Sequence, residues 1–241
     1  MDRDDPSYKG QAGYTRFLLA IYDPWVLGFM ARAVWRCPTP PVVERYRGLF
    51  GRRHLDVGPG TGYFLEKAAP AETEITLLDP NPNVLARAGG RLAARNPTEI
   101  QADVMKPLPV DGRFDSAALS AVLHCLRGPM DHKAVAIRNV ADVLEPDGVL
   151  FGITVLGTAE RHTPQARAVL RAFNWHGDFD NLGDTAEGLR RILEDSFRTV
   201  EVDIVGSIAH FTATAPRLDP RVKPADRPPA GARAAVPPEE R

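Results

Sequence analysis

Apolar residues along the chain follow two patterns: short runs in which they dominate, and positions that recur every three or four residues. The runs predict buried strands at 54–57, 75–79, 98–103, 114–121 and 149–155. The helical spacing predicts helices at 13–22, 23–35, 39–50, before residue 69, and at 82–95, 130–144 and 184–196. Strands that alternate with helices are typical of a parallel sheet covered by helices on both faces.

The last part of the chain has a different pattern. Two strand-like runs, 200–205 and 208–215, are separated only by Gly206 and Ser207. Two residues can close an antiparallel hairpin, whereas a parallel crossover needs a much longer connection. We therefore expect an α/β fold: a doubly wound, mostly parallel seven-stranded sheet with a reversed C-terminal edge strand, plus an N-terminal helical lid.

Proline indicates where the folded part ends. Seven of the 22 prolines lie in 216–241, where large apolar residues nearly vanish, and this composition predicts a disordered tail. Residues 1–12 are similarly poor in apolar groups and are expected to be flexible. The remaining 13–215 has the length of one domain.

The charge balance narrows the possible partners. The chain has 30 Lys and Arg residues against 31 Asp and Glu residues, and this balance disfavours nucleic acid as a partner. No apolar run reaches the ~18 residues of a membrane span, and the acidic start is unlike a secretory signal. The two cysteines, Cys37 and Cys125, form neither a paired metal motif nor a disulfide framework. We therefore expect a cytoplasmic protein that does not bind membranes.

A glycine turn after the first predicted strand is the strongest local signal, with Gly58, Gly60 and Gly62 at alternate positions. In an open α/β sheet ligands bind at the carboxyl ends of the strands, and glycines let the backbone approach them closely. A dinucleotide fingerprint requires a third glycine where this chain has Tyr63, which disfavours a nicotinamide cofactor. Asp79 ends the second strand, where a carboxylate can accept two hydrogen bonds from a ribose diol.

These motifs resemble the class I S-adenosylmethionine-dependent methyltransferases of the small-molecule type, over roughly 50–155 and in the closing hairpin. The resemblance implies that Asp56 lies near the amino end of the methionine moiety, that Asp79 binds the ribose and that Asp103 flanks the adenine. It implies S-adenosylmethionine as cofactor and S-adenosylhomocysteine as product. The implied cofactor-binding residues are Tyr14, Asp56, Gly58, Pro59, Gly60, Thr61, Gly62, Asp79, Pro80, Asn81, Asp103, Val104, Ser120 and Ala121.

The same resemblance divides the expected domain into three parts. A helical lid at 13–50 precedes a cofactor-binding core at 51–155, and a substrate-side loop with the closing helix and hairpin follows at 156–215. The segment Ser120–Leu123 lacks the Asn/Asp-Pro-Pro-aromatic run of amino-methyltransferases in this family, and no paired Asp or Asn ligands point to a magnesium-dependent enzyme. We therefore expect O-, N- or C-methylation of a small organic molecule, in secondary metabolism and without a metal.

Methyl transfer from a sulfonium mainly requires an acceptor that is held in line and shielded from water, and a base is needed only where a proton must leave. His124, after the fourth strand, is the first candidate for such a catalytic base, and His176 is the second. The predicted substrate-binding residues are Tyr22, Trp25, Trp175 and Asp178, from the N-terminal helices and the irregular stretch 156–183. Aromatic residues at helical spacing also serve core packing, and His124 can instead orient its loop.

Two other functions remain open from the sequence. The chain could bind the cofactor without turnover, as a regulator or partner protein, and the proline-rich tail is compatible with that role. A nicotinamide oxidoreductase is the other alternative, which Tyr63 opposes. Either a monomer or a homodimer fits, since 13–35 is apolar enough to pack between chains.

Overall fold

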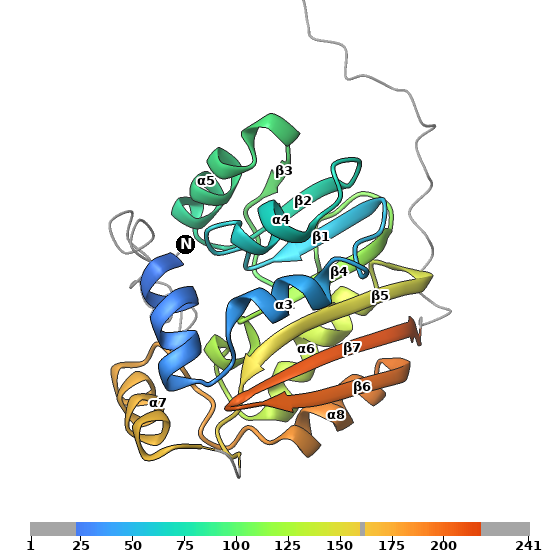
Figure 1. The fold of residues 1–241 in the computed structure, drawn as a ribbon. Coiled ribbons are helices and arrows are strands. Elements are labelled where there is room, and N and C mark those ends of the chain that lie inside the picture. The colour runs from blue at the N-terminus through green and yellow to red at the C-terminus, as the bar shows by residue number, and fades with distance from the viewer. Residues whose placement is uncertain (1–22, 160–161, 218–241) are drawn as a thin grey trace, which may run out of the picture.

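The computed structural model describes residues 23–159 and 162–217. Within these residues seven strands form one sheet, in the spatial order β3-β2-β1-β4-β5-β7-β6 (Figure 1). The strands are β1 (Arg53–Val57), β2 (Glu74–Leu78), β3 (Thr98–Ile100), β4 (Phe114–Ser120), β5 (Leu144–Val155), β6 (Phe197–Val205) and β7 (Ile208–Pro216). The helix expected at 13–22, with Tyr14 and Tyr22, lies outside the described residues, as does the expected tail beyond Arg217.

The sheet reverses direction once, at the strand that follows the two-residue turn. Strands β1 to β5 are mutually parallel, and β7 pairs antiparallel with β5 on one side and β6 on the other. β7 is therefore inserted between them, and β6 forms the outer edge. Gly206 in the turn has a φ of +61°, a conformation that suits glycine. The expected α/β fold, with seven strands and one reversal at its C-terminal end, is confirmed.

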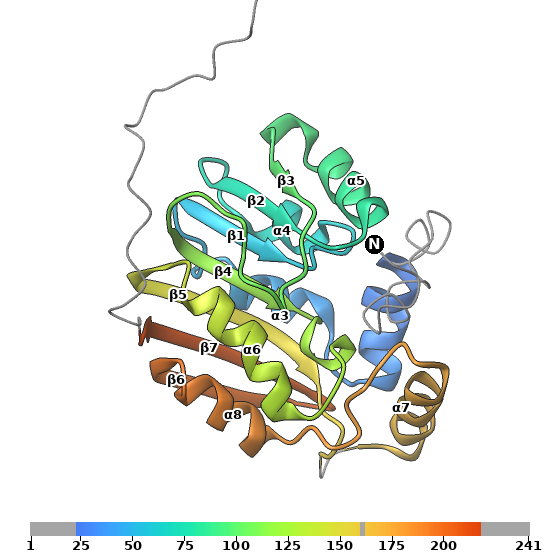
Figure 2. The same ribbon diagram turned by 180° about the vertical axis from the view of Figure 1, so that it is seen from behind.

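Helices cover both faces of the sheet (Figures 1 and 2). α3 (Thr39–Tyr46), α4 (Tyr63–Ala68) and α5 (Pro82–Arg91) lie on one face, and α6 (Met130–Ala141) and α8 (Ala186–Glu194) lie on the other. Polar caps start two of them, since the side chain of Asn81 accepts a hydrogen bond from the N–H of Asn83, and that of Thr185 from the N–H of Gly188. Because both faces are covered, the central strands β1 and β4 are buried along most of their length.

The stretch 156–183 contains a helix that the sequence analysis did not predict. α7 (Pro164–His176) begins after Thr163, whose side chain caps it, and ends at Gly177, which has a φ of +90°. Only Ala166 and Leu170 of this helix are buried. Ala166, Val169, Leu170 and Phe173 nevertheless recur at helical spacing, so a helical pattern was present in this segment although it was expected to be irregular.

A wide helix, η1 (Asp23–Val34), lies beside α7 at the carboxyl ends of the parallel strands (Figure 1). Its hydrogen bonding is of the π type, and the N–H of Trp35 continues it by donating to the carbonyl of Met30, five residues earlier. Of the lid expected at 13–50, η1 occupies this position, whereas α3 packs on the sheet through Tyr46. Within the described ranges, no helix has the length and apolar character that a membrane span requires.

Candidate active site

The glycine turn links β1 to α4 at the carboxyl end of the sheet. Gly58, Gly60 and Gly62 have φ values of +67°, +56° and +74°, a region that L side chains rarely adopt. A Cβ at Gly58 would lie 2.5 Å from Cγ2 of Val122, so this glycine also allows β1 to approach the segment after β4. The sequence spacing therefore corresponds to a backbone that only glycine can form without strain.

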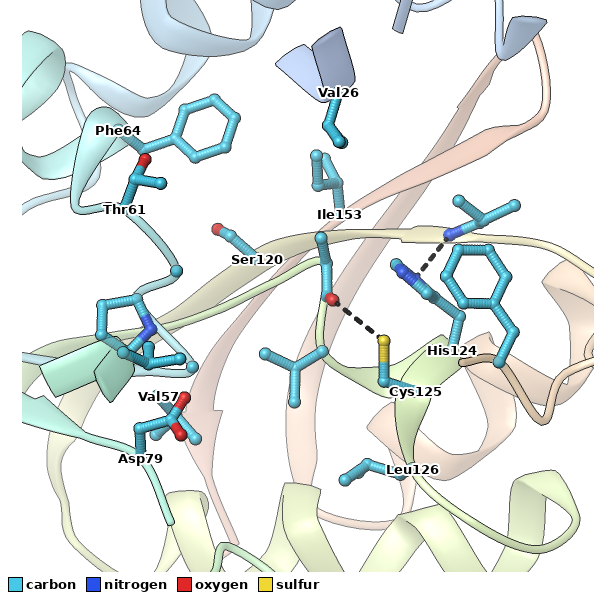
Figure 3. A pocket seen from close by; sticks show the side chains of 18 of the residues that line it. Val26, Val57, Thr61, Phe64, Asp79, Ser120, His124, Cys125, Leu126 and Ile153 are labelled. Atoms are coloured by element: carbon cyan, nitrogen blue, oxygen red, sulfur yellow. Dashed lines mark hydrogen bonds between the residues drawn. The ribbon is translucent and has the colours of Figure 1, made fainter. Parts of the chain in front are cut away.

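A cavity of about 580 Å³ opens over this turn and lies within the size range of small-molecule sites (Figure 3). It extends from Asp79 on one side to His124 on the other. The turn and the ends of β1, β2 and β4 contribute polar groups, while η1, β5 and the segment after α7 contribute apolar ones. Twelve of the predicted cofactor-binding residues line it: Asp56, Gly58, Pro59, Gly60, Thr61, Asp79, Pro80, Asn81, Asp103, Val104, Ser120 and Ala121.

Asp56 presents a carboxylate oxygen without a hydrogen-bond partner. The residue is 4% exposed, and no atom of the described chain bonds to its Oδ1. Its Oδ2 lies 3.7 Å from Nε2 of His54, which is itself buried. Burial raises the pKa of the Asp56 carboxyl, and the neighbouring imidazole of His54 opposes that shift. Asp56 lines the cavity, but its Oδ1 is fully buried, so a rotation of the side chain would bring this unpartnered acceptor to a cationic donor such as an ammonium group.

Asp79 and Asp103 hold fixed positions at the ends of β2 and β3. Oδ1 of Asp79 accepts the backbone N–H of Asn81 at 2.7 Å, which leaves Oδ2 toward the cavity. Burial raises the pKa of Asp79 to about 7, with a smaller contribution from the charge of Asp56. Oδ1 of Asp103 accepts the N–H of Met105 at 2.9 Å. Both carboxylates can therefore accept hydrogen bonds from a ligand without moving.

Two predicted cofactor residues fall outside this arrangement. Gly62 caps α4 and does not line the cavity, although its hydrogen bond to the carbonyl of Pro59 closes the turn. Tyr14 lies outside the described residues. Conversely, Ala121 has a φ of +63°, which is strained for a residue with a Cβ, directly where β4 enters the cavity wall. Nothing in the sequence signals that strain.

The predicted substrate-side residues separate into two groups. Trp25 of η1 and Asp178, just after α7, line the cavity. Trp175 and His176 do not: Trp175 is 89% exposed, and the His176 side chain is 71% exposed and pairs with Asp178 at 3.2 Å. The buried face of α7, with Ala166 and Leu170, packs against the core, and Trp175 and His176 lie on its solvent-exposed side. The structure thus corrects their assignment to the pocket, and Tyr22 lies outside the described residues.

His124 lines the cavity, but its geometry does not fit a general base. Its Nδ1 accepts the backbone N–H of Val155 at 3.2 Å (Figure 3). The same nitrogen lies 3.2 Å from Oγ1 of Thr154. Burial and, to a smaller extent, the charge of Lys133 together lower the pKa of the imidazole to about 3. The sequence places this histidine correctly at the cavity, but the role of proton acceptor expected for it does not agree with these contacts.

Sequence reasoning placed the substrate side on the N-terminal helices and 156–183, but missed the strand residues at the apolar end of the cavity and the contacts that hold η1 there. The apolar wall consists of Met30, Trp35, Val155, Phe173, Phe179 and Ile208. At the start of η1, Oδ1 of Asp23 accepts the hydroxyl of Thr61 at 2.6 Å, and Arg91 of α5 pairs with the same carboxylate. Asp23 was recognisable only as a helix cap, because its partners lie far away in the sequence.

Comparisons with known proteins agree with this architecture. Residues 55–150 match a protein family described as a methyltransferase domain. The physcion biosynthesis cluster O-methyltransferase of Aspergillus chevalieri is 36% identical over 222 residues, which cover 90% of this chain and 100% of that protein. The demethylluteothin O-methyltransferase of Streptomyces thioluteus is 36% identical over 213 residues, with coverages of 87% and 93%.

Among solved structures, one similar fold is that of the N-methyltransferase NodS from Bradyrhizobium japonicum WM9, in complex with S-adenosyl-L-homocysteine. The TM-score is 0.62 at 19% sequence identity, and the alignment covers 88% of this chain and 99% of that one. At this identity the likeness concerns the fold.

Proposed function

The chain belongs to the class I S-adenosylmethionine-dependent methyltransferases, and we propose that it methylates an oxygen atom of a small, largely apolar acceptor. The observation that carries the proposal is a cavity that has carboxylates at one end and apolar side chains at the other. Two relatives of nearly the same length are named as O-methyltransferases, of a physcion biosynthesis cluster and of demethylluteothin. We expect the chain to act on such small molecules as a monomer or homodimer in the cytoplasm.

The residues present fit the cofactor. Asp56 is a buried carboxylate with an unpartnered oxygen, the group that the ammonium end of a methionine moiety would satisfy. Oδ2 of Asp79 is positioned to accept hydrogen bonds from a ribose diol, because Oδ1 is already held by Asn81. Gly58 and Gly60 leave the turn without side chains where the backbone would pass beneath the ligand.

S-Adenosylmethionine, when bound, supplies a methyl group on a positively charged sulfur, which leaves as a neutral thioether. The chain itself would bind the cofactor and the acceptor, orient them toward each other and exclude water. Asp56, Asp79 and Asp103 would hold the charged and polar parts of the cofactor at the ends of β1, β2 and β3. Trp35 and Phe179, whose ring centroids are 6.3 Å apart, would pack against a flat acceptor and keep water from the transfer.

Calorimetry with S-adenosylhomocysteine tests the cofactor assignment. We expect micromolar binding by the wild-type chain, and a loss of at least about tenfold in Asp56→Ala and Asp79→Ala, since each removes a charged hydrogen-bond acceptor. Trp175→Ala is the matched control, because that side chain lies on the outer side of α7. Binding that survives both carboxylate substitutions would contradict the assignment.

A product screen tests the acceptor atom. The chain is incubated with S-adenosylmethionine that carries a trideuterated methyl group, together with separate panels of phenols, conjugated enols and aromatic amines. We expect labelled methyl ethers by mass spectrometry from the hydroxyl panels. Labelled products from the amines alone would replace oxygen by nitrogen, and a chain that binds the cofactor but labels nothing would favour the non-catalytic alternative.

A further inference from the structure

The hydrogen bonds of His124 fix the position of its proton. A backbone N–H can only donate, so the N–H of Val155 occupies the lone pair of Nδ1 at 3.2 Å. The hydroxyl of Thr154 lies 3.2 Å from the same nitrogen, but the single lone pair of Nδ1 is already occupied by the N–H of Val155. A neutral imidazole whose Nδ1 accepts carries its single proton on Nε2. The side chain is consequently a hydrogen-bond donor at Nε2 and has no free lone pair there.

The groups around His124 keep it neutral. On the α6 side lies Lys133, whose charge disfavours a second cation although Asp184 binds its ammonium group at 2.6 Å. On the side of the segment after α7, the ring of Phe179 packs against the imidazole with centroids 4.3 Å apart. The acids of that segment are directed elsewhere, since Asp178 pairs with His176 and a carboxylate oxygen of Asp180 accepts the N–H of Gly128. These contacts and its burial account for a histidine pKa of about 3.

The donor atom of His124 faces the cavity. The residue lines the cavity beside Cys125 and Ser120, and within the described part of the chain its Nε2 makes no hydrogen bond. Nε2 has no hydrogen-bond partner among the described residues and is not fully buried, so a ligand in the cavity can reach it. A donor aimed into a largely apolar cavity requires an acceptor from the ligand.

We propose that His124 donates a hydrogen bond from Nε2 to an oxygen anion of the methyl acceptor, and that the acceptor is a hydroxyl compound acidic enough to bind already ionised. Acidic phenols and enols conjugated with a carbonyl group belong to this class. The inference rests on the proposed O-methylation and names its substrate class.

The chemistry balances without a base in the cavity. The acceptor proton leaves to solvent before binding, and the oxygen anion then forms a bond to the methyl carbon while the carbon–sulfur bond breaks with its electron pair remaining on sulfur. An anion and a sulfonium cation become a neutral ether and a neutral thioether. An ordinary phenol, with a pKa of ~10, would have to lose its proton inside the cavity, where His124 has no lone pair to receive it. A charge-assisted hydrogen bond in an apolar surrounding favours the anion instead.

Binding of 4-nitrophenol to the complex of the full chain with S-adenosylhomocysteine tests the donor without catalysis, because the phenolate absorbs at longer wavelength than the phenol. We expect the bound probe to ionise at lower pH than the free probe. His124→Gln should retain this shift, since a glutamine amide also donates at that distance, and His124→Phe should abolish it. A wild-type complex that shows no phenolate signal, or leaves the ionisation of the probe unshifted, would overturn the proposal.

Steady-state kinetics separate a donor from a base. With acceptors of different acidity, we expect the acidic limb of the kcat/KM profile to follow the pKa of the acceptor. His124→Phe should lose about 100-fold in kcat, the usual cost of removing an oxyanion donor, and His124→Gln should lose less than about tenfold. Equal losses in the two variants, or a limb that stays constant across acceptors, would indicate a base and contradict the proposal.

Asp178→Asn examines the carboxylate at the acceptor end of the cavity, whereas Asp56, Asp79 and Asp103 lie at the cofactor end. We expect this variant to keep both the 4-nitrophenolate signal and the acceptor-dependent limb. If it loses the limb, Asp178 receives the proton and the inference about His124 is wrong. Binding of S-adenosylhomocysteine should be unchanged in every His124 variant, so that a failure of this inference is distinguishable from a failure of the proposed function.

Discussion

Asp79 illustrates how burial turns a carboxylate into a group that titrates near neutral pH. Its pKa is raised from 3.8 to about 7, and the form that accepts hydrogen bonds from a ribose diol is the ionised one. We expect the Kd of 5′-methylthioadenosine, which carries the ribose but no methionine end, to rise as pH falls below 7, by up to about tenfold per pH unit. In Asp79→Asn the affinity should be weaker and independent of pH between about 6 and 8.

The raised pKa of Asp79 affects folding stability in the opposite direction: the ionised form that favours ligand binding lowers the stability of the fold. Between 3.8 and about 7 the folded chain keeps a proton on Asp79 that the unfolded chain has lost, so stability falls as pH rises through this window. Asp79→Asn should therefore have a higher Tm than the wild-type chain at pH above 7 in the absence of ligand. An unchanged or lower Tm, measured by calorimetry, would show that the ionised carboxylate is compensated within the fold.

Gly58 and Gly60 form a matched pair for the glycine turn. Both have positive φ, but a Cβ at Gly58 would meet Val122 at 2.5 Å, whereas none of the described atoms lies within 4 Å of one at Gly60. Gly60→Ala should cost about 1–2 kcal/mol of folding free energy from backbone strain. Gly58→Ala should cost more and weaken S-adenosylhomocysteine binding at least about tenfold. Equal unfolding midpoints in urea for the two variants would contradict the role of the close contact.

At the scale of single residues, the sequence predicts the positions of the polar groups in the cavity better than it predicts their chemical roles. Asp56, Asp79 and the turn could be placed because strand ends and glycine spacing are local signals. The role of His124 could not be predicted, because the backbone N–H that fixes its tautomer belongs to Val155, on another strand.

At the scale of elements, two tryptophans on neighbouring helices have different surroundings. Trp25 of η1 lines the cavity although it is 56% exposed, and Trp175 of α7 is 89% exposed outside it. We expect Trp25→Ala to raise the KM for the acceptor several-fold while leaving S-adenosylhomocysteine affinity nearly unchanged, because we propose that the acceptor binds at the apolar end of the cavity. Trp175→Ala should change neither quantity. An acceptor KM that responds to Trp175 instead would place the pocket on the outer side of α7.

The buried ion pair between Lys133 and Asp184 joins α6 to the segment before α8. Its side chains are 0% and 2% exposed, with the charged atoms 2.6 Å apart. Lys133→Met should lower the free energy of unfolding by about 3–5 kcal/mol, because it leaves a buried carboxylate without a counter-ion. The exposed pair Arg191–Asp131 is the control, and Arg191→Met should cost no more than about 1 kcal/mol. Urea denaturation compares the two.

A double substitution separates the lost charge from lost packing at this ion pair. Lys133→Met combined with Asp184→Asn removes the uncompensated charge and should recover part of the stability. If the double variant is as unstable as the sum of the single variants, the pair contributes independent packing contacts rather than charge.

The elements themselves were predictable wherever a wide apolar face or a capping residue marks them. Asn81 with Pro82 identified α5 correctly, and the alternation of strands and helices gave the layers. α7 was missed although Thr163 and Gly177 mark its ends and its apolar residues recur at helical spacing, because the aromatic and polar residues at its C-terminal end were interpreted as a loop.

At the scale of the whole molecule, η1 is supported at both ends by parts that are distant in sequence. Its start is bound through Asp23 to the glycine turn and to α5. At its end, the carbonyl of Trp35 accepts the N–H of Ser207 at 2.8 Å, in the turn between β6 and β7. The order of strands followed from general rules, but these long-range supports could not be predicted, since neither partner carries a motif.

The turn at Gly206 and Ser207 also sets the order in which the molecule can be completed. A Cβ at Gly206 would lie 2.1 Å from the carbonyl oxygen of Trp35, so the turn and the end of η1 fit closely together. During synthesis η1 leaves the ribosome before any strand, and the turn that supports it leaves after six of the seven described strands. The growing chain thus contains the glycine turn at Gly58–Gly62 long before η1 can close the cavity. The site is assembled only after the hairpin of β6 and β7 has been translated.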